Sequence, residues 1–408
     1  MQPMLKKITI NQLIPGMFID HLDRSWLSMD LISPRVKSRE DVEKLKAMGV
    51  AEVYIDPVKG NDLPDSLGLA QKALSGAVPA AGSTYLGEIS GAHGVYQDAQ
   101  SAVTQMMRMV QRGEAPSMAT VRSTVEKMID SILRNRDALT SLVTLKENNQ
   151  SVFQHCIRVA ILSLAVGSHI GFNIKDMKTL GMGAMLHDIG KMKLPRQVAE
   201  KTAPLNEQEY QKYKEHALLG ARLLDDSQEI EKNALLILLH HHERPDGTGF
   251  PQGLSNDTIS AYARIVSIAD AFDNLLHKPQ STEQLTPHDT LHILRQWGGK
   301  ALDGDLVEQF IAAMGIYPAG SLVRLSDHRL AIVLSSKNNS SIQPRVWIVF
   351  DANQRMLPLG EMVDLSALSV KPPLTVVEAV NPGRLGFDLI RYVSEKGLFT
   401  GVPQMENA

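Results

Sequence analysis

The sequence predicts a mainly α protein, a helical bundle with a small N-terminal α+β module and a β-rich C-terminal appendage. Apolar residues recur at helical spacing through residues 97–318, which predicts the bundle. Short β-prone segments alternate with turn residues in residues 1–65 and again in residues 319–408, which predicts the two flanking parts. The 408 residues exceed the length of one typical domain, so two or three domains are expected.

The overall composition is that of an ordinary globular protein. Hydrophobic residues make up 43% of the chain and charged residues 21%, and the formal net charge is -3. This balance does not favour a nucleic-acid polymer or a membrane surface as partner, and we expect neither a signal peptide nor a membrane span. The single cysteine, Cys156, excludes an internal disulfide framework and is typical of a reducing compartment, so we expect a cytoplasmic protein.

The two flanking parts have the composition of short strands and turns. In residues 1–65, LKKITINQLIPGMFI and AEVYIDPVKG favour strands, and REDVEKLKAMG between them favours a helix. In residues 319–408, SLVRLSDHRLAIVLSS, RVWIVFDANQ and MVDLSALSV favour strands joined by Asp and Asn turns. The sequence alone does not indicate what this appendage does.

The bundle is expected to begin after a linker. Residues 66–96 are rich in Gly, Ala, Ser and Pro, which predicts a flexible connection. Two helices are expected over residues 97–145, with a break at Pro116 and an N-cap at Ser117.

The centre of the bundle sequence is the stretch LGMGAMLHDIGK, which places His187 and Asp188 side by side in an apolar run. A buried carboxylate without a partner is costly, so a metal ion, a salt bridge or water must satisfy it. A buried structural pair would also explain the stretch. Further candidate ligands recur at intervals of roughly 25 to 30 residues, which lets the helices of a bundle direct one ligand each at a common centre. They are His155, His216, His241, His242 and Asp270.

Local patterns support several of these positions. His155 shares a helical face with apolar residues, so its imidazole is expected to point inward, as a ligand or as a satisfied core histidine. The segment that carries His216 begins with a capping box formed by Asn206 and Glu209. Asp270 lies in a polar stripe of an otherwise apolar helix, which suits a metal ligand or the partner of an inward Arg or Lys.

Three consecutive histidines run from His240 to His242. They cannot all converge, because neighbouring side chains on a helix diverge by about 100°. We therefore keep His241 and His242 as ligands and expect His240 to be structural or solvated. The loop DGTGFPQGL follows, and its Gly247 and Gly249 allow the backbone to approach a bound ligand, although a surface turn has the same composition.

Four segments of this central block together resemble the HD-GYP domain, a bacterial subfamily of HD phosphohydrolases. They are HDIGK, KTAPLNEQEYQKYKEHALLG, HHERPDGTGFP and ARIVSIADAFDNL. The resemblance covers residues 145–318 and implies an HD-type helical bundle. The N-terminal segments KITINQLIPGMFID and VYIDPVKG are similar to an uncharacterised module often found ahead of HD-GYP domains.

The resemblance implies a cyclic di-GMP phosphodiesterase with two or three iron or manganese ions, in which a metal-bridging hydroxide attacks the phosphate. The product would be linear pGpG, and GMP if the second phosphodiester is also cut. Carried over by position, one metal is held by His155, His187, Asp188 and Asp270, and the second by His216, His241 and His242, with Asp188 as a bridge.

The same resemblance implies two catalytic residues, the bridging Asp188 and Lys191. The Lys191 ammonium would offset charge on a phosphate oxygen, although a solvated surface lysine is the alternative at this position. Gly247, Gly249 and Lys278 are the other candidates for contact with the substrate.

Three positions depart from the family pattern. Ser151 stands where members with a third metal have a glutamate, so we expect two metal ions. Phe250 replaces the tyrosine of the family name and lacks its hydroxyl. The basic segment after the last aspartate reads HKPQS in residues 277–281, which leaves Lys278 as a phosphate contact and predicts slow turnover.

Two other functions remain open on the sequence. One is a cyclic di-GMP receptor or protein-interaction module, and the other is an HD phosphohydrolase that acts on another nucleotide. Protein partners at the Gly-Phe-Pro loop of residues 249–251 or at the N-terminal module, and a homodimer, are compatible with the sequence.

Overall fold

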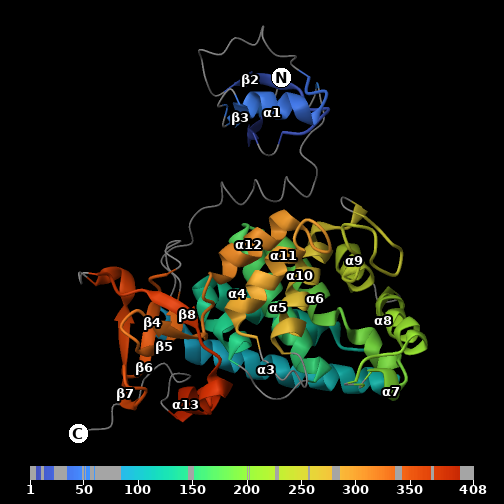
Figure 1. Ribbon diagram of the computed structural model, residues 1–408. Coiled ribbons are helices and arrows are strands. Elements are labelled where there is room, and N and C mark those ends of the chain that lie inside the picture. Colours follow the sequence, from blue (N-terminus) through green and yellow to red (C-terminus); the bar gives the residue numbers. More distant parts are fainter. Residues whose placement is uncertain are drawn as a thin grey trace. The chain divides into compact units, whose positions relative to one another are not determined.

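The computed structural model describes most of the chain. The described residues are 6–10, 13–22, 35–47, 50, 52–55, 59, 84–145, 151–199, 201, 203–225, 229–255, 258–277, 285–335, 342–368 and 372–395. They belong to two compact units, Met1–Ala77 and Val78–Ala408 (Figure 1). The mainly α fold class is confirmed, with strands in both flanking parts and helices between them.

The N-terminal unit is a three-stranded antiparallel sheet with one helix. Its elements are β1 (Lys6–Thr9), β2 (Ile19–Leu22), α1 (Arg39–Ala47) and β3 (Glu52–Ile55), and β3 is the central strand. Asp41 stabilises the start of α1, because its carboxylate accepts hydrogen bonds from the backbone N–H groups of Lys37 and Ser38. Apolar residues of the strands and of α1, including Ile8, Val53 and Leu45, share one core. The predicted α+β module is therefore confirmed.

The predicted linker of residues 66–96 is wrong over its last part. Residues 66–83 lie outside the described residues. The helix α3 (Tyr85–Gln111), however, begins inside the predicted linker. The Thr84 side chain caps this helix by accepting a hydrogen bond from the N–H of Gly87. Small residues are frequent here, yet buried residues recur at helical spacing: Tyr85, Ile89, Ala92, Tyr96 and Ala99. Their burial offsets the cost of glycine in a helix, which is about 1 kcal/mol per residue.

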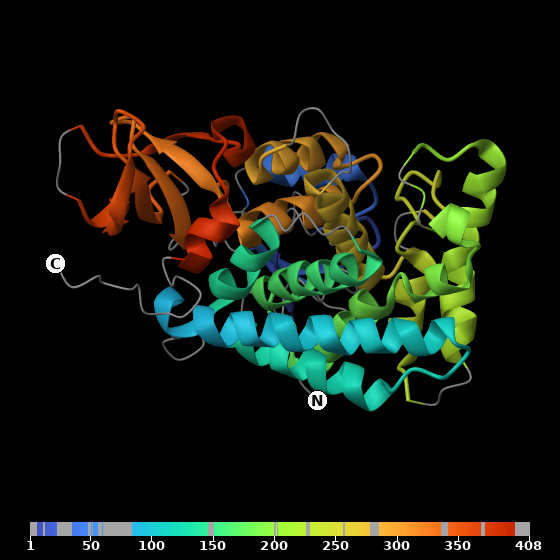
Figure 2. The ribbon, with the colours of Figure 1, turned by 90° about the horizontal axis from the view of Figure 1, so that it is seen from below.

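The second long helix, α4 (Met118–Thr144), packs along α3 (Figure 2). It begins at the predicted N-cap, Ser117, whose hydroxyl accepts from the N–H of Thr120. The backbone leaves the helix at Asn135, with φ -160° and ψ 104°. The Asn135 side chain then accepts from the N–H of Ala138 at 3.2 Å, so the helix starts again after an internal cap.

The helix α5 (Val152–His169) lies in the interior of the bundle, between α4, α6 and α10 (Figure 2). Within the described residues it is the one helix long and apolar enough to cross a membrane by length and composition, and 72% of it is buried inside the protein. The other elements of the bundle follow in order: α6 (Ile174–Leu186), η3 (Ile189–Lys193), α7 (Arg196–Ala199), α8 (Glu207–Asp225), α9 (Lys232–His240), α10 (Ala261–Leu276), α11 (Pro287–Trp297) and α12 (Gly304–Met314).

The C-terminal part is an antiparallel sheet that belongs to the same compact unit as the bundle. Its strands are β4 (Leu322–Leu325), β5 (Leu330–Ser335), β6 (Arg345–Phe350), β7 (Met356–Asp364) and β8 (Val376–Ala379), in the order β7-β6-β5-β4-β8, with the short elements η5 (Leu365–Ala367), η6 (Pro382–Leu385) and α13 (Leu389–Glu395). The Thr144 hydroxyl at the end of α4 donates to the carbonyl of Ala319 and ties the sheet to the bundle. The predicted β-rich appendage is confirmed.

Candidate metal centre

The site is built around the end of α6. That helix ends at Leu186, and the chain tightens through Asp188, with φ -101° and ψ 7°, into η3. Gly190 lets η3 lie directly on α8, because an added Cβ would lie 2.0 Å from the carbonyl oxygen of His216. This close contact of two backbones brings the predicted His187-Asp188 pair beside His216.

Asp188 lies between two groups of histidines and is 1% exposed. Its Oδ1 is 3.4 Å from His216 Nε2 and 3.9 Å from His241 Nε2. Its Oδ2 is 3.6 Å from His155 Nε2 and 3.5 Å from His187 Nε2. Each oxygen of one carboxylate therefore faces a separate pair of imidazoles.

The first group consists of His155 on α5, His187 at the end of α6 and Asp270 on α10. His155 Nε2 lies 3.3 Å from His187 Nε2 and 2.9 Å from Asp270 Oδ1. The distance from His187 Nε2 to Asp270 Oδ1 is 3.8 Å. The amide of Asn274, one turn further along α10, donates to Asp270 Oδ1 and orients this carboxylate.

The second group consists of His216 on α8 with His241 and His242 at the end of α9. The Nε2 atoms of His216 and His241 lie 3.3 Å apart, and the centre of the His242 ring is 5.0 Å from that of His216. One ligand atom from each of these residues and from Asp188 lies within 4.8 Å of all the others. His240 belongs to neither group among the described residues.

Hydrogen bonds fix which ring nitrogen can bind a cation in three of the imidazoles. The Nδ1–H groups of His187, His216 and His241 donate to the carbonyl oxygens of Ala184, Tyr213 and Leu238, each three residues earlier in the chain. Their Nε2 lone pairs therefore face the centre. Burial lowers the pKa of His216 to about 4 and that of His242 to about 3, and it also lowers the pKa of His187 and His241. These side chains are neutral imidazoles at pH 7, as metal ligands must be.

The donor set fits divalent metal ions. Asp188 Oδ1 is buried and accepts no hydrogen bond from the described residues. The Nε2 atoms of His216 and His241 face each other at 3.3 Å, and because both rings donate from Nδ1, their Nε2 lone pairs repel unless a cation lies near both. Imidazole nitrogens and carboxylate oxygens are ligands that divalent transition metals accept.

Lys191 reaches the same centre from η3. Its Nζ lies 2.5 Å from Asp188 Oδ2 and 5.1 Å from the centre of the Tyr213 ring, and its side chain is 12% exposed. Burial by itself lowers the pKa of Lys191, but the Asp188 carboxylate outweighs burial and raises it, so the ammonium stays charged. The alternative of a solvated surface lysine is wrong. Sequence reasoning missed Tyr213, whose signal is its place three residues before His216, on the same helical face.

The loop after α9 is ordered by a residue that sequence reasoning also missed. Glu243 is 1% exposed and accepts from the N–H groups of Gln252 and Leu254 at 2.6 and 2.9 Å. Gly247 has φ +76°, which favours glycine. An added Cβ at Gly249 would lie 2.4 Å from the backbone nitrogen of Arg244. The chain's own backbone therefore already requires glycine at both positions.

Two of the three departures from the family pattern have a local explanation. Ser151 is the N-cap of α5, and its hydroxyl accepts from the N–H of Gln154 at 3.3 Å. The ring of Phe250 packs 4.6 Å from the ring of His242, a contact that needs no hydroxyl. Lys278 lies outside the described residues. Its neighbour His277 points inward, with Nδ1 3.0 Å from Asp273 Oδ1.

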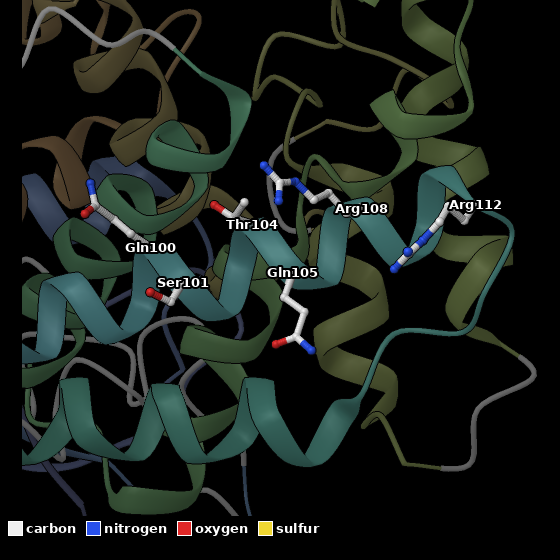
Figure 3. A pocket seen from close by; sticks show the side chains of 6 residues that line it. All are labelled: Gln100, Ser101, Thr104, Gln105, Arg108 and Arg112. Atoms are coloured by element: carbon white, nitrogen blue, oxygen red, sulfur yellow. The ribbon is translucent and has the colours of Figure 1, made fainter.

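A cavity of about 530 Å³ lies away from these residues, on one face of α3. Figure 3 shows its lining side chains, which come from this helix and from its C-cap residue, Arg112: Gln100, Ser101, Thr104, Gln105, Arg108 and Arg112. None of the predicted site residues that the structure describes lines it.

Comparison with known proteins relates most of the chain to proteins already described. Residues 136–306 match the model of the HD domain, and residues 5–121 match that of a domain of unknown function, DUF3391. The chain is 32% identical to cyclic di-GMP phosphodiesterase PA4108 of Pseudomonas aeruginosa, over 89% of each chain. It is 34% identical to the cyclic di-GMP phosphodiesterase response regulator RpfG of Xanthomonas campestris, over 44% of this chain and 48% of the relative.

Among solved structures, an HD-GYP-type protein from Bdellovibrio bacteriovorus, Bd1817, aligns with a TM-score of 0.47 and 19% identity, over 75% of this chain and 98% of that one. The match to the Pseudomonas relative extends over nearly the whole chain and includes both the HD domain and the N-terminal module. The chain therefore belongs to the HD-GYP family of HD-domain proteins and carries the DUF3391 module ahead of its HD domain.

Proposed function

We propose that this chain is a metal-dependent phosphodiesterase that hydrolyses cyclic di-GMP. The observation that carries the proposal is the place of Asp188, whose two oxygens face two separate groups of imidazoles. An arrangement in which two ions share one carboxylate suits the hydrolysis of phosphodiesters. The activity named for the Pseudomonas relative, which matches 89% of the chain, supports the choice of substrate.

We further infer that the centre holds two ions, of iron or manganese. His155, His187 and Asp270 would hold one and His216, His241 and His242 the other, with Asp188 between them. Mixed imidazole and carboxylate donors suit these metals. Ser151 caps α5 and brings no carboxylate for a third ion. When bound, the ions would neutralise charge on the phosphate oxygens and lower the pKa of a water molecule at the site.

The protein side chains around the ions have separate tasks. The Lys191 ammonium, held at the edge of the centre by Asp188 and Tyr213, offsets the charge that grows on a phosphate oxygen in the transition state. The oxygen of a water molecule becomes bonded to phosphorus, while the bond from phosphorus to the sugar oxygen breaks and that oxygen takes up a proton. The first product is linear pGpG, and a second cycle on pGpG gives GMP.

Several finer predictions accompany this function. Gly247 and Gly249 would let the loop backbone approach the substrate, and Lys278 would contact a phosphate. Protein partners would bind at the Gly-Phe-Pro loop or at the N-terminal module, and the protein would act in the cytoplasm, as a homodimer if two copies associate. Each of these stays a prediction from the sequence.

A direct assay tests the proposed activity. The protein is purified without oxygen, its metal content is counted, and it is incubated with cyclic di-GMP while the products are separated by chromatography. We expect about two ions per chain and release of pGpG, and Asp188→Ala should lose both ions and all hydrolysis. Binding of cyclic di-GMP by fully loaded protein without any product would favour a receptor, and faster cleavage of another cyclic dinucleotide would reassign the substrate.

A second assay tests how tightly the substrate is held. Lys278 offers a point charge where two parallel hydrogen bonds from a guanidinium would hold phosphate better. We therefore expect Lys278→Arg combined with Ser281→Arg to raise kcat/KM on cyclic di-GMP by roughly ten-fold or more, since a charged hydrogen bond contributes about 1.5 to 3 kcal/mol. Metal content should not change. An unchanged kcat/KM in the fully loaded double variant would place the limitation elsewhere.

A further inference from the structure

His155 differs from His187, His216 and His241 in how it is oriented. His187, His216 and His241 each donate from Nδ1 to a carbonyl oxygen of the turn that precedes them. The Nδ1 of His155 instead lies 2.8 Å from Oδ2 of Asp273, a carboxylate on α10 that is 118 residues away in the sequence. The direction of the His155 ring therefore depends on a contact between two helices, whereas the other three rings are fixed by their own local backbone.

Asp273 is itself held by a buried arginine. It is 1% exposed, and Arg158 of α5, which is 4% exposed, donates to both of its oxygens at 2.6 and 2.9 Å. Arg158 lies one turn after His155 on the same helix, so both residues bind the same carboxylate from one side. This two-point contact fixes the plane of the carboxylate, which a single hydrogen bond would leave free to turn.

A third helix closes the network. The Tyr96 side chain on α3 is hydrogen bonded to Arg158, and Tyr96 is 5% exposed. The chain of contacts therefore runs from Tyr96 through Arg158 and Asp273 to His155, whose Nε2 faces Asp270 and Asp188. Asp273 contacts His155 through Nδ1, the ring nitrogen that points away from the centre.

We propose that Asp273, fixed by Arg158, is a positioning residue that sets the affinity of the first ion-binding group without affecting the second. The proposal rests on the two-ion centre of the proposed function. A carboxylate that accepts from the far nitrogen of a ligating imidazole fixes the ring and makes it a stronger donor, and loss of such a partner lowers metal affinity ten- to a hundred-fold. In the second group, His216 and His241 are oriented by backbone carbonyls, which a substitution at Asp273 leaves in place.

The test is a titration of the metal-free full-length chain with Mn²⁺. Binding is measured by calorimetry and by the electron paramagnetic resonance signal of free Mn²⁺. The parent protein should bind two ions. In Asp273→Asn, one ion should bind ten- to a hundred-fold more weakly and the other with unchanged affinity. Excess Mn²⁺ should restore kcat with little change in the KM for cyclic di-GMP.

Matched variants separate positioning from general stability. Asp303→Asn is the control, because Asp303 forms a comparable ion pair and contacts neither ligand group. Its partner is Arg264 of α10, at a distance of 2.6 Å. Asp303→Asn should leave both affinities unchanged. Tyr96→Phe removes a single hydroxyl from the far end of the network and should weaken the same ion by a smaller factor, which keeps the test valid if Asp273→Asn does not fold.

Three outcomes distinguish the claims. A parent protein that binds no Mn²⁺ would overturn the proposed function itself. A parent that binds two ions, with Asp273→Asn and Tyr96→Phe binding both equally well, would overturn only the positioning role. Equal weakening of both ions in Asp273→Asn would also overturn it, because that result indicates a general loss of structure.

Discussion

At the scale of single residues, His240 and His241 are neighbours in the chain, but only His241 is a ligand candidate. His241 is fully buried and its Nε2 faces Asp188, while His240 lies beside Glu243 and Gln252 at the base of the loop. The cause is the rotation of about 100° per residue at the end of α9.

The two histidines give a matched pair of variants. We expect His240→Ala to keep the full metal content, and His241→Ala to lose at least one ion, because it removes a neutral imidazole that faces the second group. Metal analysis of both purified variants checks this, with circular dichroism to confirm equal helix content. Loss of metal from His240→Ala would mean that a different pair of the three histidines binds the ion.

At the scale of elements, the α3–α4 pair is joined by a buried polar contact. The Tyr85 hydroxyl lies 3.0 Å from Ser141 Oγ, and burial raises the pKa of Tyr85 from 10.0 to about 12. Below pH 10 the phenol is neutral in both the folded and the unfolded chain. Between pH 10 and pH 12 only the unfolded chain ionises, so the free energy of unfolding must fall as the pH rises.

A Tyr85→Phe variant should therefore lose less stability on going from pH 9 to pH 11 than the parent, by an amount on the order of 1.4 kcal/mol. Thermal melting followed by circular dichroism at the two pH values measures the difference. Tyr210→Phe is the control, because Tyr210 is 42% exposed and its removal should not change the alkaline loss. Parallel pH profiles for the parent and Tyr85→Phe would contradict the assigned burial of the phenol.

At the scale of the whole molecule, five elements of the bundle meet at one carboxylate. The ligand candidates come from α5, the end of α6, α8, the end of α9 and α10. Ions bound there would hold these helices together, and loss of the ions would leave lone pairs and carboxylates facing one another without a cation.

We therefore expect a chelator to lower the melting temperature of the unit that contains the bundle, Val78–Ala408. An ion present at a hundred times its Kd stabilises the folded state by about 2.7 kcal/mol, which corresponds to roughly 4 °C for a unit as large as Val78–Ala408. Differential scanning calorimetry with and without chelator measures the shift. The Asp188→Ala protein should not respond to the chelator, and an equal response would mean that the ions stabilise another part of the protein.

The sequence by itself determined the features that depend on near neighbours. Ser117 at the start of α4 and the Asn206–Glu209 capping box of α8 lie where the sequence placed them, because a cap is formed by residues three apart. The seven ligand candidates were also predicted, since motif spacing on amphipathic helices places polar residues on inward faces. The helix that begins at Tyr85 was missed, because its small residues favour a linker and only its burial against α4 favours a helix.

Only the tertiary structure decided which distant groups become partners. Lys191 is buried by Tyr213 of another element, His155 is oriented by Asp273 from α10, and Glu243 orders a loop whose N–H groups follow nine and eleven residues later. No local pattern encodes these contacts. They form because charged and hydrogen-bonding groups that the packing of the helices removes from water must find partners inside the protein, and the fold determines which partners are within reach.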